Sequence, residues 1–321
     1  MPITVQFATN RVLTGPAEDV HSFSANITPP ADPGATIYGT AFVSDASLTA
    51  DTVGAVTTIQ NIQPGDFSDS AKGDLSDPGR NLLVFIHGFD NSFENAITRA
   101  AFNTQWFARS GLPAADMAVV AFSWPSLGTL IGRPLPGDAY RKDQMVAGQS
   151  GLPIMRFFAN LLPIVSDARD RGNRIFLLAH SMGNWALQAA VESWFVNTHS
   201  GANMFDEAIL AAADEVFSSF DNPPVGRLTA LDQLAKRISV YYSRADQVLD
   251  LSAVVNHFTP RLGQDGPLGR QDANRYPSAT YRMVDCSGFS DYSIDLASSH
   301  QYYRRSPGVR TDIANTMAGL V

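Results

Sequence analysis

Short apolar runs alternate with longer amphipathic segments from residue 81 to the end of the chain. Largely apolar runs, typical of strands covered on both faces, occupy residues 81–86, 117–123, 175–179, 207–212, 238–242 and 280–284. Apolar residues at helical spacing predict helices over residues 91–110, 151–171, 185–197, 228–236, 252–258 and 308–319. Strands that alternate with helices form βαβ units, which build a parallel sheet. We therefore expect an α/β fold with a mostly parallel, doubly wound sheet and flanking helices.

Residues 1–80 are richer in Pro, Gly, Asp, Thr and Ser, and their pattern is less regular. It predicts strands at residues 3–7 and 38–43, with turns at pairs such as Pro33-Gly34. These strands either extend the main sheet to about eight strands or form a partly separate N-terminal cap. No repeat or low-complexity linker divides the chain, so we expect residues 1–321 to form a single domain.

Two long stretches rich in Gly and Pro, residues 125–151 and 259–279, interrupt this alternation. Loops of such length are uncommon unless they cover a site. Both follow strand ends, where doubly wound sheets bind their ligands. We predict that they shape a substrate site, with plain surface insertion as the alternative.

Composition narrows the classes of function. The chain has 23 Lys and Arg against 31 Asp and Glu, and its net charge of −8 argues against binding nucleic acid or anionic membranes. Cys286 is the single cysteine, so no intrachain disulfide forms, which fits a cytosolic or a disulfide-free exported protein. No apolar run approaches the roughly 18 residues of a membrane span, and the N-terminus lacks the features of a signal peptide. We therefore expect a cytoplasmic protein.

Residues 174–187 read as a buried strand, a tight turn and a helix. The turn, Ala179-His-Ser-Met-Gly183, is close to the G-x-S-x-G nucleophile elbow, with Ala in place of the first Gly. Such a turn needs small residues two before and two after the serine, because the backbone comes close there. Since the strand and the helix flank the motif as required, we predict that Ser181 is a nucleophile.

A serine nucleophile needs a base, usually His, held by a carboxylate. In chains with this elbow, the order is Ser, then Asp or Glu, then His. Three histidines follow Ser181: His199, His257 and His300. His300 follows the last predicted strand and lies in a polar loop. Loops that leave the carboxyl ends of the strands converge on the elbow, so His300 is the predicted base.

The acid should follow a strand between the nucleophile and the base. Strand 238–242 is the penultimate predicted strand, and the stretch that begins with it ends at Asp246. Asp246 is therefore the predicted acid. Asp214 follows strand 207–212 and is the alternative, either as the acid or as a group lining the pocket.

Catalysis also needs donors for an oxyanion. The Met182 N–H, at the start of the elbow helix, is one expected donor. The Phe89 N–H is the other, because Gly88 lets the loop after strand 81–86 turn close to the site. Trp124 adds apolar material for a substrate pocket, although it could equally belong to the core.

No motif points to a metal or a cofactor. The chain has no H-E-x-x-H and no C-x-x-C, and it lacks both the G-x-x-x-x-G-K-[ST] and the G-x-G-x-x-G nucleotide patterns. We therefore predict a site without either.

An ordered set of motifs spans most of the chain. They are Phe7-Ala-Thr-Asn-Arg11, His87-Gly-Phe-Asp-Asn-Ser-Phe93, Phe122-Ser-Trp-Pro-Ser126, Tyr140 with Asp143, Ala179-His-Ser-Met-Gly-Asn184 and His300-Gln-Tyr302. With these motifs the chain resembles the α/β-hydrolases, and more narrowly a bacterial group of them long described as of unknown function.

The resemblance implies an α/β-hydrolase fold with about eight strands, and it assigns the triad to Ser181, Asp246 and His300. Asp90 departs from the group, which has Asn there, and it places an acid beside the oxyanion loop. Residues 127–137 form a longer insert than in the group, so a substrate should not be transferred from the group to this chain. The group itself does not fix a substrate.

Together these features predict a hydrolase that cleaves small-molecule carboxylic esters through an acyl-enzyme. Thioesterase, lipase and amidase chemistry on the same triad are alternatives that the sequence does not separate. A catalytically silent binding module is a different class. Labelling of Ser181 by a fluorophosphonate discriminates between an enzyme and such a module.

Overall fold

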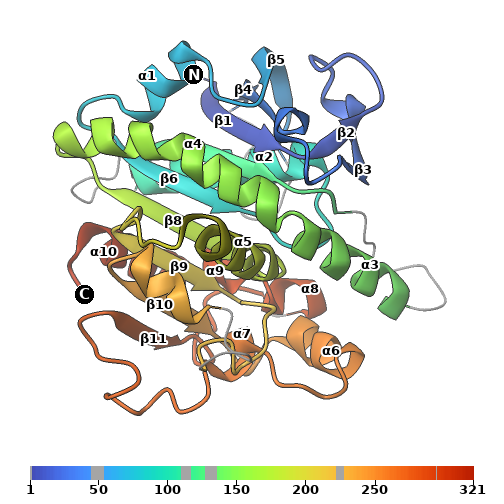
Figure 1. The fold of residues 1–321 in the computed structure, drawn as a ribbon. Coiled ribbons are helices and arrows are strands. Elements are labelled where there is room, and N and C mark those ends of the chain that lie inside the picture. The colour runs from blue at the N-terminus through green and yellow to red at the C-terminus, as the bar shows by residue number, and fades with distance from the viewer. Residues whose placement is uncertain (1, 45–53, 110–116, 127–135, 222–227, 294) are drawn as a thin grey trace.

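The computed structural model describes residues 2–44, 54–109, 117–126, 136–221, 228–293 and 295–321. Within them, nine strands form one sheet in the order β11-β10-β9-β8-β6-β7-β1-β4-β5 (Figure 1). The strands are β1 (Ile3–Thr9), β4 (Ile37–Val43), β5 (Val56–Pro64), β6 (Asn81–Ile86), β7 (Met117–Ser123), β8 (Ile175–His180), β9 (Glu207–Ala211), β10 (Ile238–Tyr242) and β11 (Tyr281–Asp285). A separate antiparallel pair consists of β2 (Arg11–Leu13) and β3 (Phe23–Ile27).

The sheet is mostly parallel, as expected. Neighbouring strands from β11 to β1 all run parallel, while β4 runs antiparallel to both β1 and β5. The two predicted N-terminal strands, β1 and β4, join this sheet. The sheet has one strand more than the sequence suggested, because β5 is an edge strand with mostly exposed Thr, Gln and Asn and has no apolar run to mark it.

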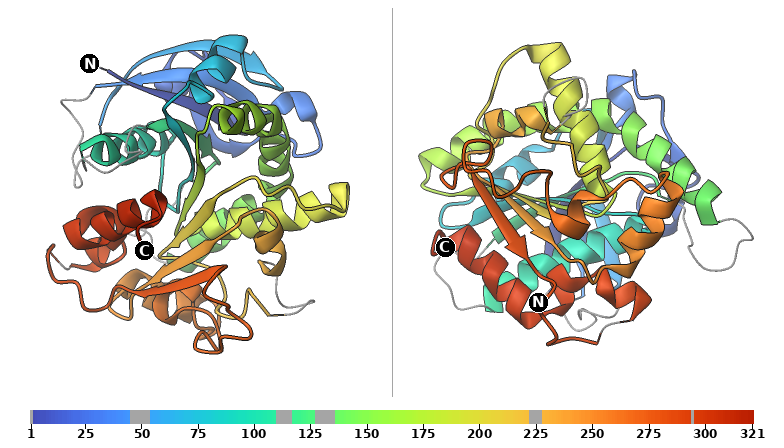
Figure 2. Two further views of the ribbon diagram at one scale, coloured as in Figure 1. Left: turned by 90° about the vertical axis from the view of Figure 1, so that its left-hand side faces the viewer. Right: turned by 90° about the horizontal axis from the view of Figure 1, so that it is seen from below.

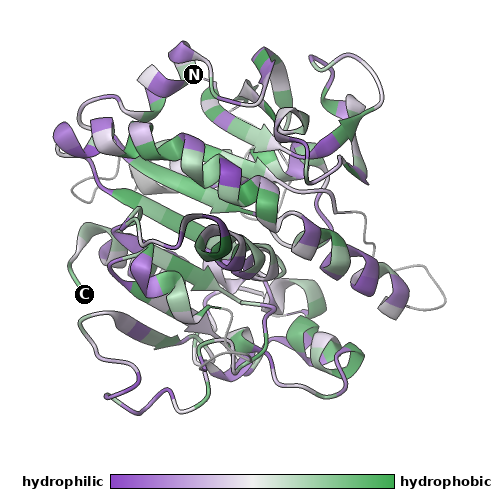
Figure 3. Cartoon of the chain, viewed as in Figure 1, coloured by the Kyte–Doolittle hydropathy of each residue, from purple (hydrophilic) through white to green (hydrophobic). Residues whose placement is uncertain are grey.

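Helices cover both faces of the sheet (Figure 2). They are α1 (Asp69–Leu75), α2 (Phe93–Arg109), α3 (Pro136–Gln149), α4 (Gly151–Asp170), α5 (Gly183–Thr198), α6 (Gln247–Val255), α7 (Leu262–Asp265), α8 (Leu296–Ser299), α9 (Tyr302–Arg305) and α10 (Pro307–Ala318). One buried cluster lies between the sheet and α4 and α5, and a second lies between the sheet and α2 and α10. The central strands are apolar almost throughout (Figure 3). Among the described residues, no helix has both the length and the apolar character of a membrane span.

Two predicted helices differ from those observed. The segment predicted as helix 228–236 forms only a 3₁₀ helix, η4 (Thr229–Gln233). The segment predicted as helix 252–258 belongs to α6, which begins five residues earlier because the Asp246 side chain caps it by accepting from the Val248 and Leu249 N–H groups. The carboxylate that matters for the site therefore also sets the start of this helix.

The two stretches predicted as loops are more regular than expected. Residues 136–149 of the first form α3, and residues 127–135 lie outside the described part of the chain. Few apolar positions mark α3: Tyr140, Val146 and Ala147 are buried, but most of the residues around them are polar. In the second stretch, the Leu262 N–H donates to Glu215 O at 2.7 Å and the Gly263 N–H to Ala213 O at 2.8 Å. The beginning of this segment is thus fixed to the chain that follows β9.

The turn between β8 and α5 packs directly against the end of β6. A Cβ atom at Gly183 would lie 2.5 Å from the His87 carbonyl oxygen and 2.6 Å from that of Ile86. Backbone atoms cannot rotate away as side chains do, so position 183 has no room for a side chain. The expectation of a small residue two positions after Ser181 is confirmed.

We expect Gly183→Ala to lower the free energy of unfolding by about 1–3 kcal/mol, because the new methyl group must displace backbone atoms. Gly73→Ala in α1 is the matched control, since nothing lies within 4 Å of its Cβ position and Ala favours a helix. Urea unfolding of both variants measures the two changes. Equal stabilities would contradict the packing argument.

Glu215 has a buried carboxyl group, and its backbone carbonyl accepts from the N–H of Leu262, the first residue of α7. Its side chain accepts from the Val216 N–H at 2.8 Å, and burial raises its pKa from 4.5 to about 7. The group therefore keeps its proton in the folded protein at pH values where the unfolded chain has lost it. It follows that stability falls as the pH rises from 4.5 to about 7.

Glu215→Gln should remove this dependence on pH. We expect the variant to exceed the wild type in stability at pH 8 by up to about 3 kcal/mol, and to differ little from it at pH 4. Thermal unfolding of both proteins at the two pH values measures the difference. A gain of the same size at both pH values would show that ionisation of Glu215 is not its cause.

Candidate active site

Three side chains from distant parts of the chain meet at the carboxyl edge of the sheet. The Ser181 Oγ lies 2.7 Å from His300 Nε2, and His300 Nδ1 lies 2.7 Å from Asp246 Oδ2. All three side chains are buried. The structure thus brings together the residues predicted as nucleophile, base and acid. The arrangement has the connectivity by which an imidazole removes a proton from a hydroxyl group.

Ser181 lies in the tight turn between β8 and α5. Its φ of 55° falls in the left-handed region, which a non-glycine residue occupies only under local constraint. The Ser181 N–H donates to Ala211 O at 3.0 Å, and Ser181 O accepts from the Asp214 N–H at 3.1 Å. The end of β9 therefore holds the turn on both sides of the serine.

Asp246 serves the site and α6 at the same time. Its Oδ1 accepts from the Val248 and Leu249 N–H groups at 3.1 Å each, while its Oδ2 faces His300. The start of a helix favours negative charge, so the carboxylate is stabilised where it is needed. Because a carboxylate only accepts, His300 Nδ1 carries the proton and Nε2 is free to accept one from Ser181.

The environment of His300 favours its protonated form. Burial alone lowers the pKa of the imidazole, but the charge and hydrogen bond of Asp246, with the charge of Asp214, leave it above its ordinary value. His180 packs beside it, with ring centroids 4.9 Å apart, and burial and the His300 charge place its own pKa well below the ordinary value. His180 is therefore a neutral neighbour.

Asp214, the alternative acid, has other partners. Its Oδ1 accepts from the Ser252 hydroxyl at 2.5 Å and from Arg261 Nε at 2.8 Å. The Ser252 hydroxyl also bonds to the Tyr140 hydroxyl at 3.0 Å, which ties α3 to α6. Asp246, and not Asp214, is the carboxylate in contact with His300. Asp214 belongs to a buried network beside Ser181. Its predicted role as a group that lines the substrate pocket stays a prediction.

Both expected oxyanion donors lie next to Ser181. Met182 directly precedes α5, and the Gly88 backbone is so close that a Cβ there would lie 2.6 Å from Ser181 Cβ. In the described part of the chain, no group accepts a hydrogen bond from the Phe89 or the Met182 N–H. The role of these two N–H groups as oxyanion donors stays a prediction.

Trp124 does not offer surface to a pocket. It is fully buried, its ring stacks on His87 at 5.1 Å and 3°, and its Nε1 donates to His87 O at 2.7 Å. Of the two alternatives predicted for Trp124, pocket or core, the structure agrees with the core, where the ring supports the loop that carries Phe89. Burial lowers the pKa of His87 to about 3, so this ring is neutral.

Asp90 is exposed and has a φ of 56°. Asp and Asn tolerate this left-handed conformation better than most residues. Partial desolvation, and then the charge of Asp143, raise its pKa. Its effect on substrate choice stays a prediction.

Several residues of the site were not predicted from the sequence. Ser299 Oγ accepts from the Gln247 N–H at 3.1 Å and joins α8 to the start of α6. The Tyr302 hydroxyl donates to Tyr241 O at 2.7 Å and accepts from the Ala212 N–H at 3.0 Å. The sequence signal for Tyr302 was its place in the late His300-Gln-Tyr302 motif. Ser299 had no comparable signal.

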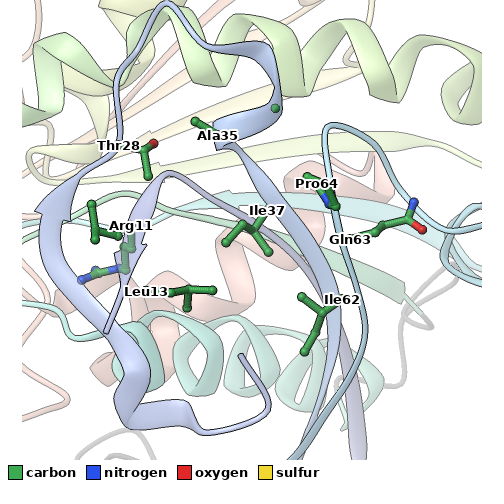
Figure 4. Close-up of a pocket in the computed structure, with 10 residues that line it drawn as sticks. Arg11, Leu13, Thr28, Ala35, Ile37, Ile62, Gln63 and Pro64 are labelled. Carbon is green, nitrogen blue, oxygen red and sulfur yellow. The ribbon is translucent and has the colours of Figure 1, made fainter. Parts of the chain in front are cut away.

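Among the residues with described positions, no group of three or more His, Cys, Asp or Glu side chains could hold a metal ion. A mostly apolar pocket lies between β2, β4 and β5 (Figure 4), and its lining includes Leu13, Ile37 and Ile62 but no member of the Ser181 group. This pocket therefore lies apart from Ser181, His300 and Asp246.

The comparison with known families agrees with this picture. Residues 67–316, more than half of the chain, match a family described as alpha/beta hydrolase of unknown function (DUF900). No curated protein matches the sequence. The resemblance drawn from the ordered motifs and the expected fold class are confirmed, and the chain belongs to this α/β-hydrolase family.

Proposed function

We propose that this protein is a serine hydrolase that cleaves carboxylic esters of small molecules through an acyl-enzyme. The observation that carries the proposal is the continuous contact from Ser181 through His300 to Asp246, at 2.7 Å on each side of the imidazole. A buried serine in a strained turn, with a base and an acid in line, is the arrangement that activates a hydroxyl group.

Acylation begins when Ser181 Oγ attacks the ester carbonyl carbon and His300 Nε2 takes the hydroxyl proton. The carbonyl electron pair moves to oxygen, and the Phe89 and Met182 N–H groups donate to the resulting oxyanion. The oxyanion then re-forms the carbonyl, the bond to the alcohol oxygen breaks, and His300 gives its proton to the leaving group. Throughout, the Asp246 carboxylate orients and stabilises the imidazolium.

Deacylation repeats these steps with water. His300 removes a proton from the water molecule, whose oxygen attacks the acyl carbon bound to Ser181. The second tetrahedral intermediate collapses, the acid departs, and the proton returns to Ser181 Oγ. The same steps apply to a thioester or an amide, in which only the leaving atom differs.

Ser181→Ala, His300→Ala and Asp246→Asn should each lower kcat on a p-nitrophenyl ester by about 10⁴-fold or more, because each removes a member of one working unit. Exposed His257, changed to Asn to suit its φ of 58°, is the control and should leave turnover unchanged. A fluorophosphonate should label Ser181 in the folded wild type. Absence of both label and turnover would favour a binding module.

The dependence of kcat/KM on pH tests the role of His300. The base must be neutral to accept a proton, so kcat/KM should rise with pH, with a midpoint above 6.5, because Asp246 and Asp214 raise the pKa of His300. Asp214→Asn removes a charge that favours the protonated ring and should move the midpoint to lower pH. A midpoint that stays in place in this variant would contradict the assignment.

A further inference from the structure

Arg11 is a buried cation that the proposed mechanism does not use. Its side chain is only 1% exposed, and burial lowers its pKa. Its Nε donates to Ser123 Oγ at 2.9 Å and its Nη1 to Ser24 O at 3.3 Å. Among the described residues, no carboxylate forms a salt bridge with it. Its hydrogen-bond partners are neutral, and the charge of Asp143 offsets only part of the cost of burying the guanidinium, so its contacts indicate what it contributes.

The Nη2 of Arg11 joins two loops at the site. It donates to Asn91 O at 2.8 Å, in the loop after β6, and to Trp124 O at 2.6 Å, directly after β7. Each of these residues in turn holds the loop that carries Phe89. Trp124 Nε1 donates to His87 O, and Asn91 Nδ2 donates to the carbonyl oxygens of Gly88 and Phe89, at 3.0 and 2.8 Å.

The direction of the Phe89 N–H follows from these contacts. Gly88 O and the Phe89 N–H belong to one trans peptide, in which the two groups point in opposite directions. Gly88 O is held by two donors, His87 Nδ1 at 2.8 Å and Asn91 Nδ2 at 3.0 Å. Fixing the carbonyl on one side fixes the N–H on the other, in a peptide that lies against Ser181.

We propose that Arg11 is a positioning residue of the oxyanion hole, which holds Asn91 and Trp124 so that the Gly88–Phe89 peptide aims its N–H at the tetrahedral intermediate. The inference rests on the proposed function of Ser181. It also gives a role to the Phe7–Arg11 motif, whose Thr9 hydroxyl donates to Ser123 O at 2.6 Å and secures the end of β1 beside β7.

The chemistry of the side chain explains why this position is an arginine. A guanidinium presents five N–H groups in a rigid plane and reaches acceptors on several segments at once. An ammonium group is a compact point charge on a flexible stem and cannot bridge Ser24, Asn91, Ser123 and Trp124 together. Arg11→Lys therefore keeps the charge but loses the bridge.

The test compares kcat, KM and the affinity for a boronic acid in Arg11→Lys and Arg11→Met. We expect kcat to fall about 10- to 100-fold and KM to stay within about twofold, because the oxyanion exists only after attack. Affinity for the boronic acid, whose tetrahedral adduct with Ser181 occupies the oxyanion hole, should weaken by a factor similar to the loss in kcat. Arg156→Met is the matched control, since Arg156 also donates to backbone carbonyls, Pro30 O at 2.8 Å and Ala31 O at 3.0 Å, but contacts neither loop.

Asn91→Ala keeps the test decisive if Arg11→Met does not fold. It should reproduce the loss in kcat, and combining it with Arg11→Lys should add little, because both act on one peptide. Variants that fold and match Arg156→Met in kcat and boronic acid affinity would overturn the proposal. Failure of the wild type to turn over any ester would instead overturn the proposed function, so the two outcomes are distinct.

Discussion

The backbone of the β8–α5 turn and the backbone at the end of β6 are in direct contact, and the rest of the site depends on this contact. It leaves no space for a side chain at Gly183 or at Gly88. Ser181 stays in a left-handed conformation, at a cost on the order of 1–3 kcal/mol, because β9 and the neighbouring loop hold it on both sides. The same contact brings the Phe89 peptide next to the serine hydroxyl. One packing constraint therefore places both Ser181 and the peptides proposed as oxyanion donors.

The parts of the fold that could be predicted are those with a local signal. The buried strands are marked by apolar runs, and Ser181 by a turn motif between a strand and a helix. His300 was found from its order in the chain and its place after the last strand. By contrast, β5 and α3 have few apolar positions, so their formation depends on neighbours distant in sequence. For Trp124 the sequence left pocket and core open, because it does not distinguish a ring that lines a pocket from one that supports a loop.

Buried charges link the segments around the site, each in a different way. Asp246 is stabilised by the start of α6 and by His300, and Asp214 by Arg261 and Ser252. Arg11 bonds to carbonyl and hydroxyl oxygens. The pairings of Asp214 with Ser252 and Arg261, and of Arg11 with Ser123 and Trp124, do not follow from sequence spacing, since these partners lie far along the chain. Their common effect is to fix loops at the carboxyl edge of the sheet, where parallel strands leave their ends free.

The position of β1 in the sheet affects how the protein reaches its native state. Thr9 bonds to Ser123, 114 positions later, and Ser181 bonds to His300 across 119 positions. Such long separations give a high contact order and a slow search for the native topology. During synthesis β1 can pair with β4 early, but its pairing with β7 and the contact of Ser181 with His300 require much more of the chain to be made. The contact between Ser181 and His300 can therefore form only after residue 300 has been made.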